Sequence, residues 1–156
     1  SEQVIVSRRN IKELLSASSV IAVGTTSMRT MESLYWYGIK LLKDPMLSFE
    51  ITQFDPYQLQ GEVPRSKALE AILNKMENEN IDSLTGETSI MIMPGYTFKV
   101  VNALITNFHQ PGSTLMLLVA AFAGDDWKQI YNDALQNDYR FLSYGDSSLL
   151  FPGESE

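Results

Sequence analysis

Hydrophobic and polar positions along the chain follow two patterns, one typical of strands and one typical of helices. Residues 4–6 and 20–23 are short apolar runs rich in β-branched side chains, which favours strands. The run at 20–23 is continuous and ends at Gly24, as expected of a strand buried on both faces in a parallel sheet. Apolar residues then recur every three or four positions, which predicts helices over 8–16 and 25–42.

The second half of the chain repeats this alternation of strands and helices. Strands are expected at 89–93, 99–106 and 147–151, and helices from Ser113 to Ala123 and from Asp125 to Asn137. Ser7 and Ser113 are suitable N-caps, and Gly124 suits the positive φ that often ends a helix. The sequence therefore predicts an α/β fold, a layered mixed or mostly parallel sheet flanked by helices.

Residues 44–88 differ in character from the rest of the chain. Prolines and a glycine interrupt the pattern, with a short strand expected near 49–54 and a helix over 66–76. We interpret 44–88 as an inserted lid or edge excursion from one domain that spans 1–156. Because a strand is expected within a few residues of Ser1, we also expect this domain to be a piece of a longer protein.

Composition and charge narrow the classes of function. The chain has 156 residues and no cysteine, and its 19 acidic against 12 basic residues give a net charge of −7. The basic residues are scattered, so the chain by itself predicts a poor nucleic-acid binder. No apolar run approaches the ~20 residues of a membrane-spanning helix, and no metal-ligand spacing occurs. The absence of cysteine fits a reducing compartment, so we expect a cytoplasmic protein without a bound metal.

The first polar strand-to-helix loop follows Gly24. Amide donors at the start of the next helix favour an anion, and the hydroxyls of Thr25 and Thr26 lie beside them. Arg29 falls on the same helical face and could hold a carboxylate through two hydrogen bonds. In the alternative interpretation, the threonines only cap the helix and Arg29 pairs with Glu32.

The second polar loop, over 107–113, contains His109, the single histidine of the chain. Asn107, Ser113 and Thr114 surround it in sequence, and the helix N-terminus that follows disfavours a protonated imidazole. This combination suits a neutral general base or hydrogen-bond donor. The alternative is a histidine with a structural role only.

A third cluster, over 139–146, carries aromatic and polar side chains. Tyr144 could stack on a base and Asp146 could bind ribose hydroxyls, whereas the alternative is an ordinary turn formed by Gly145 and Asp146.

Five segments, taken in order, resemble the S-adenosylmethionine:tRNA ribosyltransferase-isomerases of queuosine biosynthesis. They are AVGTTSMRTMES (22–33), PGYTFKVV (94–101), LITNFHQPGSTL (104–115), AFAG (121–124) and YRFLSYGD (139–146). Chains of this family are much longer, so the resemblance covers their C-terminal part. It implies that residues 1–156 are the C-terminal part of the main α/β domain, whose sheet is incomplete here because the N-terminal half is absent.

The resemblance implies an enzyme that joins the ribosyl carbons of S-adenosylmethionine to the aminomethyl group of a deazaguanine in tRNA. Adenine and methionine leave, and epoxyqueuosine remains on the tRNA. S-adenosylmethionine is then a co-substrate and tRNA the partner, with no metal required. On this hypothesis His109 is the base or proton shuttle, and Asn107 and Thr114 orient it. The expected substrate contacts are made by six residues, which are Thr25, Thr26, Arg29, Ser113, Tyr144 and Asp146.

Two further interpretations remain open. The chain could bind S-adenosylmethionine or a nucleotide without catalysis, and the chain alone is expected to be inactive. It could also be a structural domain that self-associates through 44–88.

Overall fold

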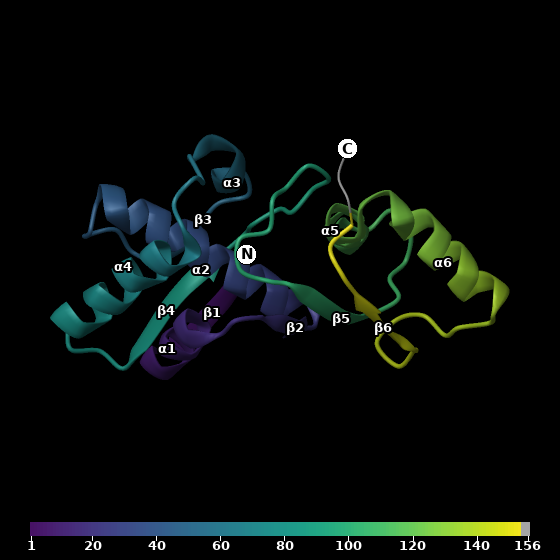
Figure 1. The fold of residues 1–156 in the computed structure, drawn as a ribbon, viewed down its shortest axis with the longest axis horizontal. Coiled ribbons are helices and arrows are strands. Elements are labelled where there is room, and N and C mark those ends of the chain that lie inside the picture. The colour runs from purple at the N-terminus through teal and green to yellow at the C-terminus, as the bar shows by residue number, and fades with distance from the viewer. Residues whose placement is uncertain (154–156) are drawn as a thin grey trace. The chain divides into compact units, whose positions relative to one another are not determined.

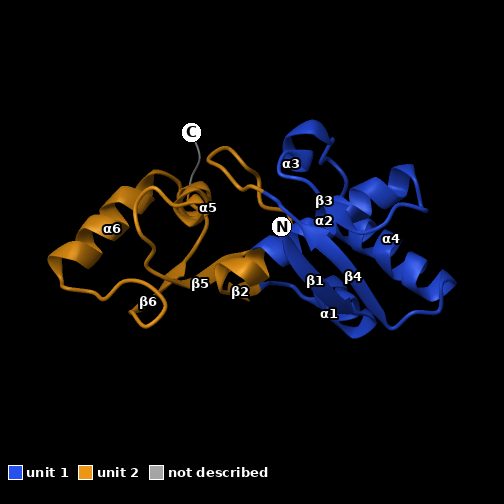
Figure 2. Cartoon of the chain, turned by 180° about the vertical axis from the view of Figure 1, so that it is seen from behind, with its two compact units in different colours: residues 1–20, 29–90 blue, residues 21–28, 91–156 orange. Residues whose placement is uncertain are grey.

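The computed structural model describes residues 1–153, which form two compact units (Figures 1 and 2). Unit 1 contains residues 1–20 and 29–90, and unit 2 contains residues 21–28 and the chain from residue 91 onward. The chain therefore passes three times between the units: directly before β2 (Ile21–Val23), inside the long helix α2 (Thr25–Lys43), and after Ile90.

Unit 1 is built on a three-stranded sheet with the strand order β1-β4-β3. β1 (Glu2–Ser7) pairs antiparallel with β4 (Ser83–Thr88), and the short β3 (Glu50–Ile51) pairs parallel with β4 on its other side. Its helices are α1 (Arg8–Ser16), most of α2 (Thr25–Lys43), α3 (Asp55–Gln58) and α4 (Arg65–Asn78).

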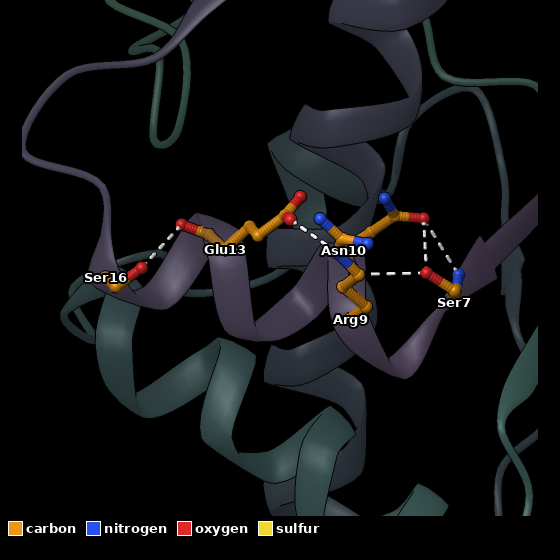
Figure 3. A network of polar contacts seen from close by, with 5 residues as sticks. All are labelled: Ser7, Arg9, Asn10, Glu13 and Ser16. Atoms are coloured by element: carbon orange, nitrogen blue, oxygen red, sulfur yellow. Dashed lines mark hydrogen bonds and ion pairs between the residues drawn. The ribbon is translucent and has the colours of Figure 1, made fainter.

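The start of α1 follows from local chemistry. The Ser7 hydroxyl oxygen accepts a hydrogen bond from the Asn10 N–H at 3.1 Å, and Asn10 Oδ1 accepts one from the Ser7 N–H at 3.0 Å. This reciprocal arrangement satisfies two backbone donors that the helix cannot pair internally (Figure 3). An ion pair between the exposed side chains of Arg9 and Glu13, one turn apart, adds a small stabilisation to α1. The prediction of Ser7 as N-cap is confirmed.

The core of unit 1 forms where α2 and α4 approach each other closely. A Cβ atom at Gly38 of α2 would lie 2.2 Å from the Ala68 carbonyl oxygen of α4, so only glycine permits this approach. The same unit contains apolar side chains with almost no exposed surface, namely Ile11, Leu34, Tyr35, Tyr37, Leu69, Ile72 and Met76.

Unit 2 is built on a second three-stranded sheet, with the order β2-β5-β6. β2 (Ile21–Val23) runs parallel to β5 (Ala103–Asn107), and β6 (Ser147–Leu150) runs antiparallel to β5. Two helices follow β5 in the chain, α5 (Thr114–Ala123) and α6 (Trp127–Gln136), joined by a short 3₁₀ turn. Gly124 begins that turn with a φ of +64°, which confirms the expected positive φ.

The predicted α/β class, with mixed sheets flanked by helices, is confirmed, and two strand assignments are wrong. Residues 89–93 are not a strand, because the strand of this region is β4, which precedes them and ends at Thr88. The strand near residue 20 is not buried on both faces, since Ala22 is buried while Ile21 and Val23 are 55% and 66% exposed.

Residues 44–88 contribute β3, α3, α4 and β4 to unit 1, and β4 is the central strand of its sheet. Their expected role as a lid stays a prediction. Within residues 1–153, no helix combines the length and apolar character needed to cross a membrane.

Substituting Gly38 tests the close approach of α2 and α4. We expect Gly38→Ala to lower the free energy of unfolding by about 1–3 kcal/mol, because the added methyl group forces the helices apart and overpacks the core. Urea denaturation followed by circular dichroism measures the change. Lys43→Ala at an exposed position of the same helix is the control, expected to stay within about 0.5 kcal/mol. Equal stability of Gly38→Ala and the unmodified chain would contradict the packing described here.

Candidate functional site

The two polar strand-to-helix connections of unit 2 leave its sheet at the same edge. β2 and β5 are parallel, with Val23 opposite Ile105, so their carboxyl ends lie side by side. The Gly24 N–H donates to the Ile105 carbonyl oxygen at 2.8 Å, and Gly24 has a φ of +90°, which lets the chain turn at once into α2. The carboxyl edge of parallel strands is where α/β proteins bind their ligands.

His109 lies just beyond the end of β5 and is held at two points. Its ring Nε2 is 3.0 Å from Oγ1 of Thr106, and its backbone N–H donates to the Tyr131 hydroxyl at 2.9 Å. Thr106 is buried, whereas His109 is half-buried. Burial lowers the pKa of His109, which favours the neutral imidazole.

An aromatic cluster fixes the loop that carries His109. The ring of Phe108 stacks on Phe141 with centroids 5.3 Å apart and contacts Tyr131 edge-on at 5.4 Å. The Phe108 carbonyl oxygen also accepts a hydrogen bond from the Leu142 N–H at 2.8 Å. The 139–146 loop therefore packs directly against the histidine loop.

The 139–146 loop is closed by the side chain of Asp146. Its Oδ2 accepts a hydrogen bond from the Arg140 N–H at 2.7 Å, and these contacts from Arg140 lower the pKa of Asp146. Gly145 is required here, because a Cβ atom would lie 2.4 Å from the Arg140 carbonyl oxygen. Tyr144, at the tip, is 99% exposed. Asp146 thus closes the turn in this structure, and the expected contacts of Asp146 with ribose hydroxyls and of Tyr144 with a base stay predictions.

The structure gives Asn107 and Thr114 other surroundings than the expected contact with the His109 ring, and their role in orienting it stays a prediction. The amide nitrogen of Asn107 instead lies 3.3 Å from the Gly145 carbonyl oxygen and 3.4 Å from that of Asp146. Thr114 is the exposed first residue of α5. The hydrogen-bond partner of the ring is Thr106, which occupies the opposite face of β5 from Asn107.

Three of the remaining predicted residues lie at helix N-termini in unit 2. Thr25 and Thr26 are the first two residues of α2, directly after the turn at Gly24. The Ser113 hydroxyl caps α5 by accepting a hydrogen bond from the Met116 N–H at 3.3 Å, as predicted. The structure therefore brings Thr25, Thr26 and the histidine loop to one edge of one sheet, the first pair through β2 and the second through β5.

Arg29 belongs to unit 1, where its partners are internal. Its guanidinium forms an ion pair with Glu2 at 2.6 Å and donates to the Ile90 carbonyl oxygen at 3.3 Å. A carboxylate therefore binds Arg29, and the chain itself provides it. The expected contact of Arg29 with a substrate carboxylate stays a prediction.

Two surface hollows occur in unit 1, and no predicted site residue lines either. One, of about 570 Å³, lies between the C-terminal end of α2 and α4 beside Met46, and the other, of about 310 Å³, lies beside β3.

The sequence interpretation missed Thr106 and Tyr131. The strand pattern carried a signal for Thr106, because in a strand the residue before Asn107 must face the other side, together with the buried Leu104. Tyr131 lies four residues after Trp127 and three before Ala134, a spacing that puts all three on one face of α6, where Tyr131 and Ala134 are buried. Nothing in the neighbouring sequence indicates that the Tyr131 hydroxyl reaches residue 109.

The fold and the site define an α/β protein with polar loops at the carboxyl edge of a parallel strand pair. Their chemistry is that of a neutral histidine, hydroxyl groups and an exposed tyrosine. The family model described as queuosine biosynthesis protein matches residues 1–150, and the chain belongs to this family.

Relatives with known names agree with this assignment. The chain is 58% identical over 73 residues to the S-adenosylmethionine:tRNA ribosyltransferase-isomerase of Methylorubrum extorquens, covering 46% of this chain and 20% of that protein. It is 49% identical over 87 residues to the enzyme of the same name from Pelodictyon phaeoclathratiforme, covering 54% and 26% respectively.

A solved structure matches almost the whole chain. The crystal structure of S-adenosylmethionine tRNA ribosyltransferase from Thermotoga maritima superimposes with a TM-score of 0.61 and 29% identity. The match covers 96% of this chain and 40% of that one. The chain thus spans about two fifths of the length of its solved relative.

The protonation of His109 is directly measurable because the chain has no other histidine. We expect its pKa to lie below the usual ~6.5, because burial penalises the charged ring. The unfolded chain then binds the proton more readily, so the contribution of this group to stability is present above pH ~6.5 and falls as the pH drops towards the folded-state pKa. A pH titration of the imidazole carbon-bound protons by NMR measures the value. A pKa at or above 6.5 would show that the ring is hydrated or paired with an acid.

Proposed function

We propose that the chain is the C-terminal part of an S-adenosylmethionine:tRNA ribosyltransferase-isomerase and carries the proton-transfer group of that enzyme. The family membership and the names of the relatives support the activity. The observation that carries the assignment of the site is His109, a half-buried histidine with a lowered pKa at the carboxyl edge of the β2–β5 pair.

The proposed reaction needs a base close to the ribose carbon attached to sulfur. The sulfonium of S-adenosylmethionine acidifies that carbon, and a neutral imidazole can take its proton. In the overall reaction the nitrogen of the aminomethyl group forms a bond to an electrophilic ribosyl carbon and loses a proton. The bonds from the ribosyl group to adenine and to the sulfur of methionine break, and their electron pairs leave with adenine and methionine. A lowered pKa keeps His109 in the proton-accepting form near neutral pH.

Other groups at the same edge would bind the substrates. Backbone amides at the start of α2, with Thr25 and Thr26, favour an anionic group such as a phosphate or the methionine carboxylate. The exposed ring of Tyr144 would stack on adenine or on a tRNA base, a contact worth about 1–3 kcal/mol per base. Asp146 would act mainly by holding Tyr144 in place, since its carboxylate already binds Arg140. Since the substrate is tRNA, the enzyme would act in the cytoplasm.

A second candidate function is binding of S-adenosylmethionine without catalysis. The chain spans only two fifths of the solved relative, so other parts of the family's fold would complete the site. Calorimetry of this chain with S-adenosylmethionine separates the two. Binding without adenine release would favour the binding function for the isolated chain.

Replacing His109 tests the proposed role in the complete enzyme that contains this chain. We expect His109→Ala to lower the rate of adenine release from S-adenosylmethionine, with precursor-bearing tRNA present, by about 10²–10⁴-fold, because the proton acceptor is lost. Chromatographic detection of free adenine measures the rate.

Gln110→Ala is the matched control, because this neighbour is exposed and accepts the hydrogen bond from the Ser113 hydroxyl through its backbone carbonyl, which the substitution keeps. It should retain the unmodified rate. Near-normal turnover of His109→Ala, with an unchanged pH profile, would exclude His109 as the base.

A further inference from the structure

We infer that Thr106 is the positioning residue of the site: its hydroxyl holds Nε2 of His109, so that Nδ1 is the ring nitrogen that takes the proton. This inference rests on the proposed role of His109 as a base. It assigns to Thr106 the orienting function that the sequence suggested for Asn107 and Thr114.

The hydroxyl of Thr106 is fixed by the sheet. Thr106 lies opposite Ser148 in the β5–β6 pair, and its carbonyl oxygen accepts a hydrogen bond from the Ser148 hydroxyl at 3.2 Å. The side chain is 6% exposed and faces the same side of β5 as the buried Leu104. Because threonine is branched at Cβ, its χ1 has few alternatives in such a position. Oγ1 is therefore a rigid hydrogen-bonding point.

Two attachments leave the histidine little freedom. Oγ1 of Thr106 lies 3.0 Å from Nε2, and the Tyr131 hydroxyl receives the backbone N–H of His109 at 2.9 Å. Tyr131 is the titratable side chain bonded to this residue, and burial raises its pKa, so it is neutral near pH 7. Among residues 1–153, no side chain or backbone group forms a hydrogen bond with Nδ1.

The ring nitrogen that does chemistry depends on the tautomer, since the Thr106 hydroxyl can either donate to Nε2 or accept from it, and the inferred tautomer has Nε2–H as the donor. A neutral imidazole carries one N–H donor and one acceptor, and the hydrogen bond made by one nitrogen determines the state of the other. When Nε2–H donates to Oγ1, the lone pair of Nδ1 is left to accept a proton. The opposite tautomer would present an N–H at Nδ1, which cannot act as a base.

Nitrogen NMR of the ¹⁵N-labelled chain tests the tautomer, because all imidazole signals come from His109. Above its pKa, we expect long-range ¹H–¹⁵N spectra to show Nε2 protonated and Nδ1 unprotonated, and we expect Nδ1 to be the nitrogen whose shift changes on titration. A protonated Nδ1, or a titrating Nε2, would overturn the inference without any variant.

Two substitutions test the role of the hydroxyl. Thr106→Val keeps the shape and removes the hydroxyl, so exchange of the Nε2 proton with water should accelerate about tenfold, as expected for loss of one hydrogen bond. Thr106→Ser keeps the hydroxyl and should keep the slow exchange. Unchanged exchange in Thr106→Val, or fast exchange in a Thr106→Ser chain that gives the unmodified backbone spectrum, would contradict the assignment.

Activity separates this inference from the proposed function. In the complete enzyme, Thr106→Val should lower kcat for adenine release about tenfold with little change in KM, and Thr106→Ser should restore it. If the expected tautomer is found while His109→Ala remains fully active, the hydrogen bond exists and the proposed function of His109 is wrong. If His109→Ala is inactive while Thr106→Val retains full kcat, Thr106 does not position the base.

Discussion

The parallel pairing of β2 with β5 is the constraint on which the site depends. Because the two strands run in the same direction and Val23 lies opposite Ile105, the connections after both strands begin at one edge. The hydrogen bond from Gly24 extends this pairing by one residue, at a φ that side-chain-bearing residues rarely adopt. The antiparallel β6 completes the arrangement, since Ser147 lies opposite Asn107 and the 139–146 loop therefore reaches the same edge.

Elements determined by neighbouring residues could be predicted from the sequence, and elements determined by distant pairing could not. Ser7 and Ser113 identify helix starts because the capped amides lie three residues away. β4 shows no continuous apolar run, and it becomes a strand because β1, almost 80 residues earlier, pairs with it. Glycine inside a strand usually weakens it, so Gly86 in the middle of β4 argues against a strand. In the structure the Phe49 ring fills the space that a side chain at residue 86 would need.

The same distinction applies to the site. The residue types and the loops that carry them could be predicted, because a lone histidine beside amide and hydroxyl groups after a buried strand has few roles. Its hydrogen-bond partners could not be assigned by proximity in sequence. Asn107 is nearer to His109 than Thr106 is, but alternation along β5 turns its amide towards residues 145 and 146. Tyr131 is 22 residues away, and only the packing of Phe108 against α6 brings its hydroxyl to the loop.

The net charge of residues 91–153 favours S-adenosylmethionine, the smaller of the two proposed substrates, over tRNA. Between residues 91 and 153, three basic residues stand against five aspartates, so this segment attracts a cation more readily than a polyanion. The interactions with Arg140 lower the pKa of Asp146 and keep its carboxylate ionised, and burial favours a neutral His109. A neutral His109 ring would not repel the positively charged sulfonium of S-adenosylmethionine, whereas a protonated ring would place a second positive charge near the reacting carbon. Affinity for tRNA would then come mainly from parts of the family's fold beyond this segment, with Tyr144 contributing stacking rather than charge.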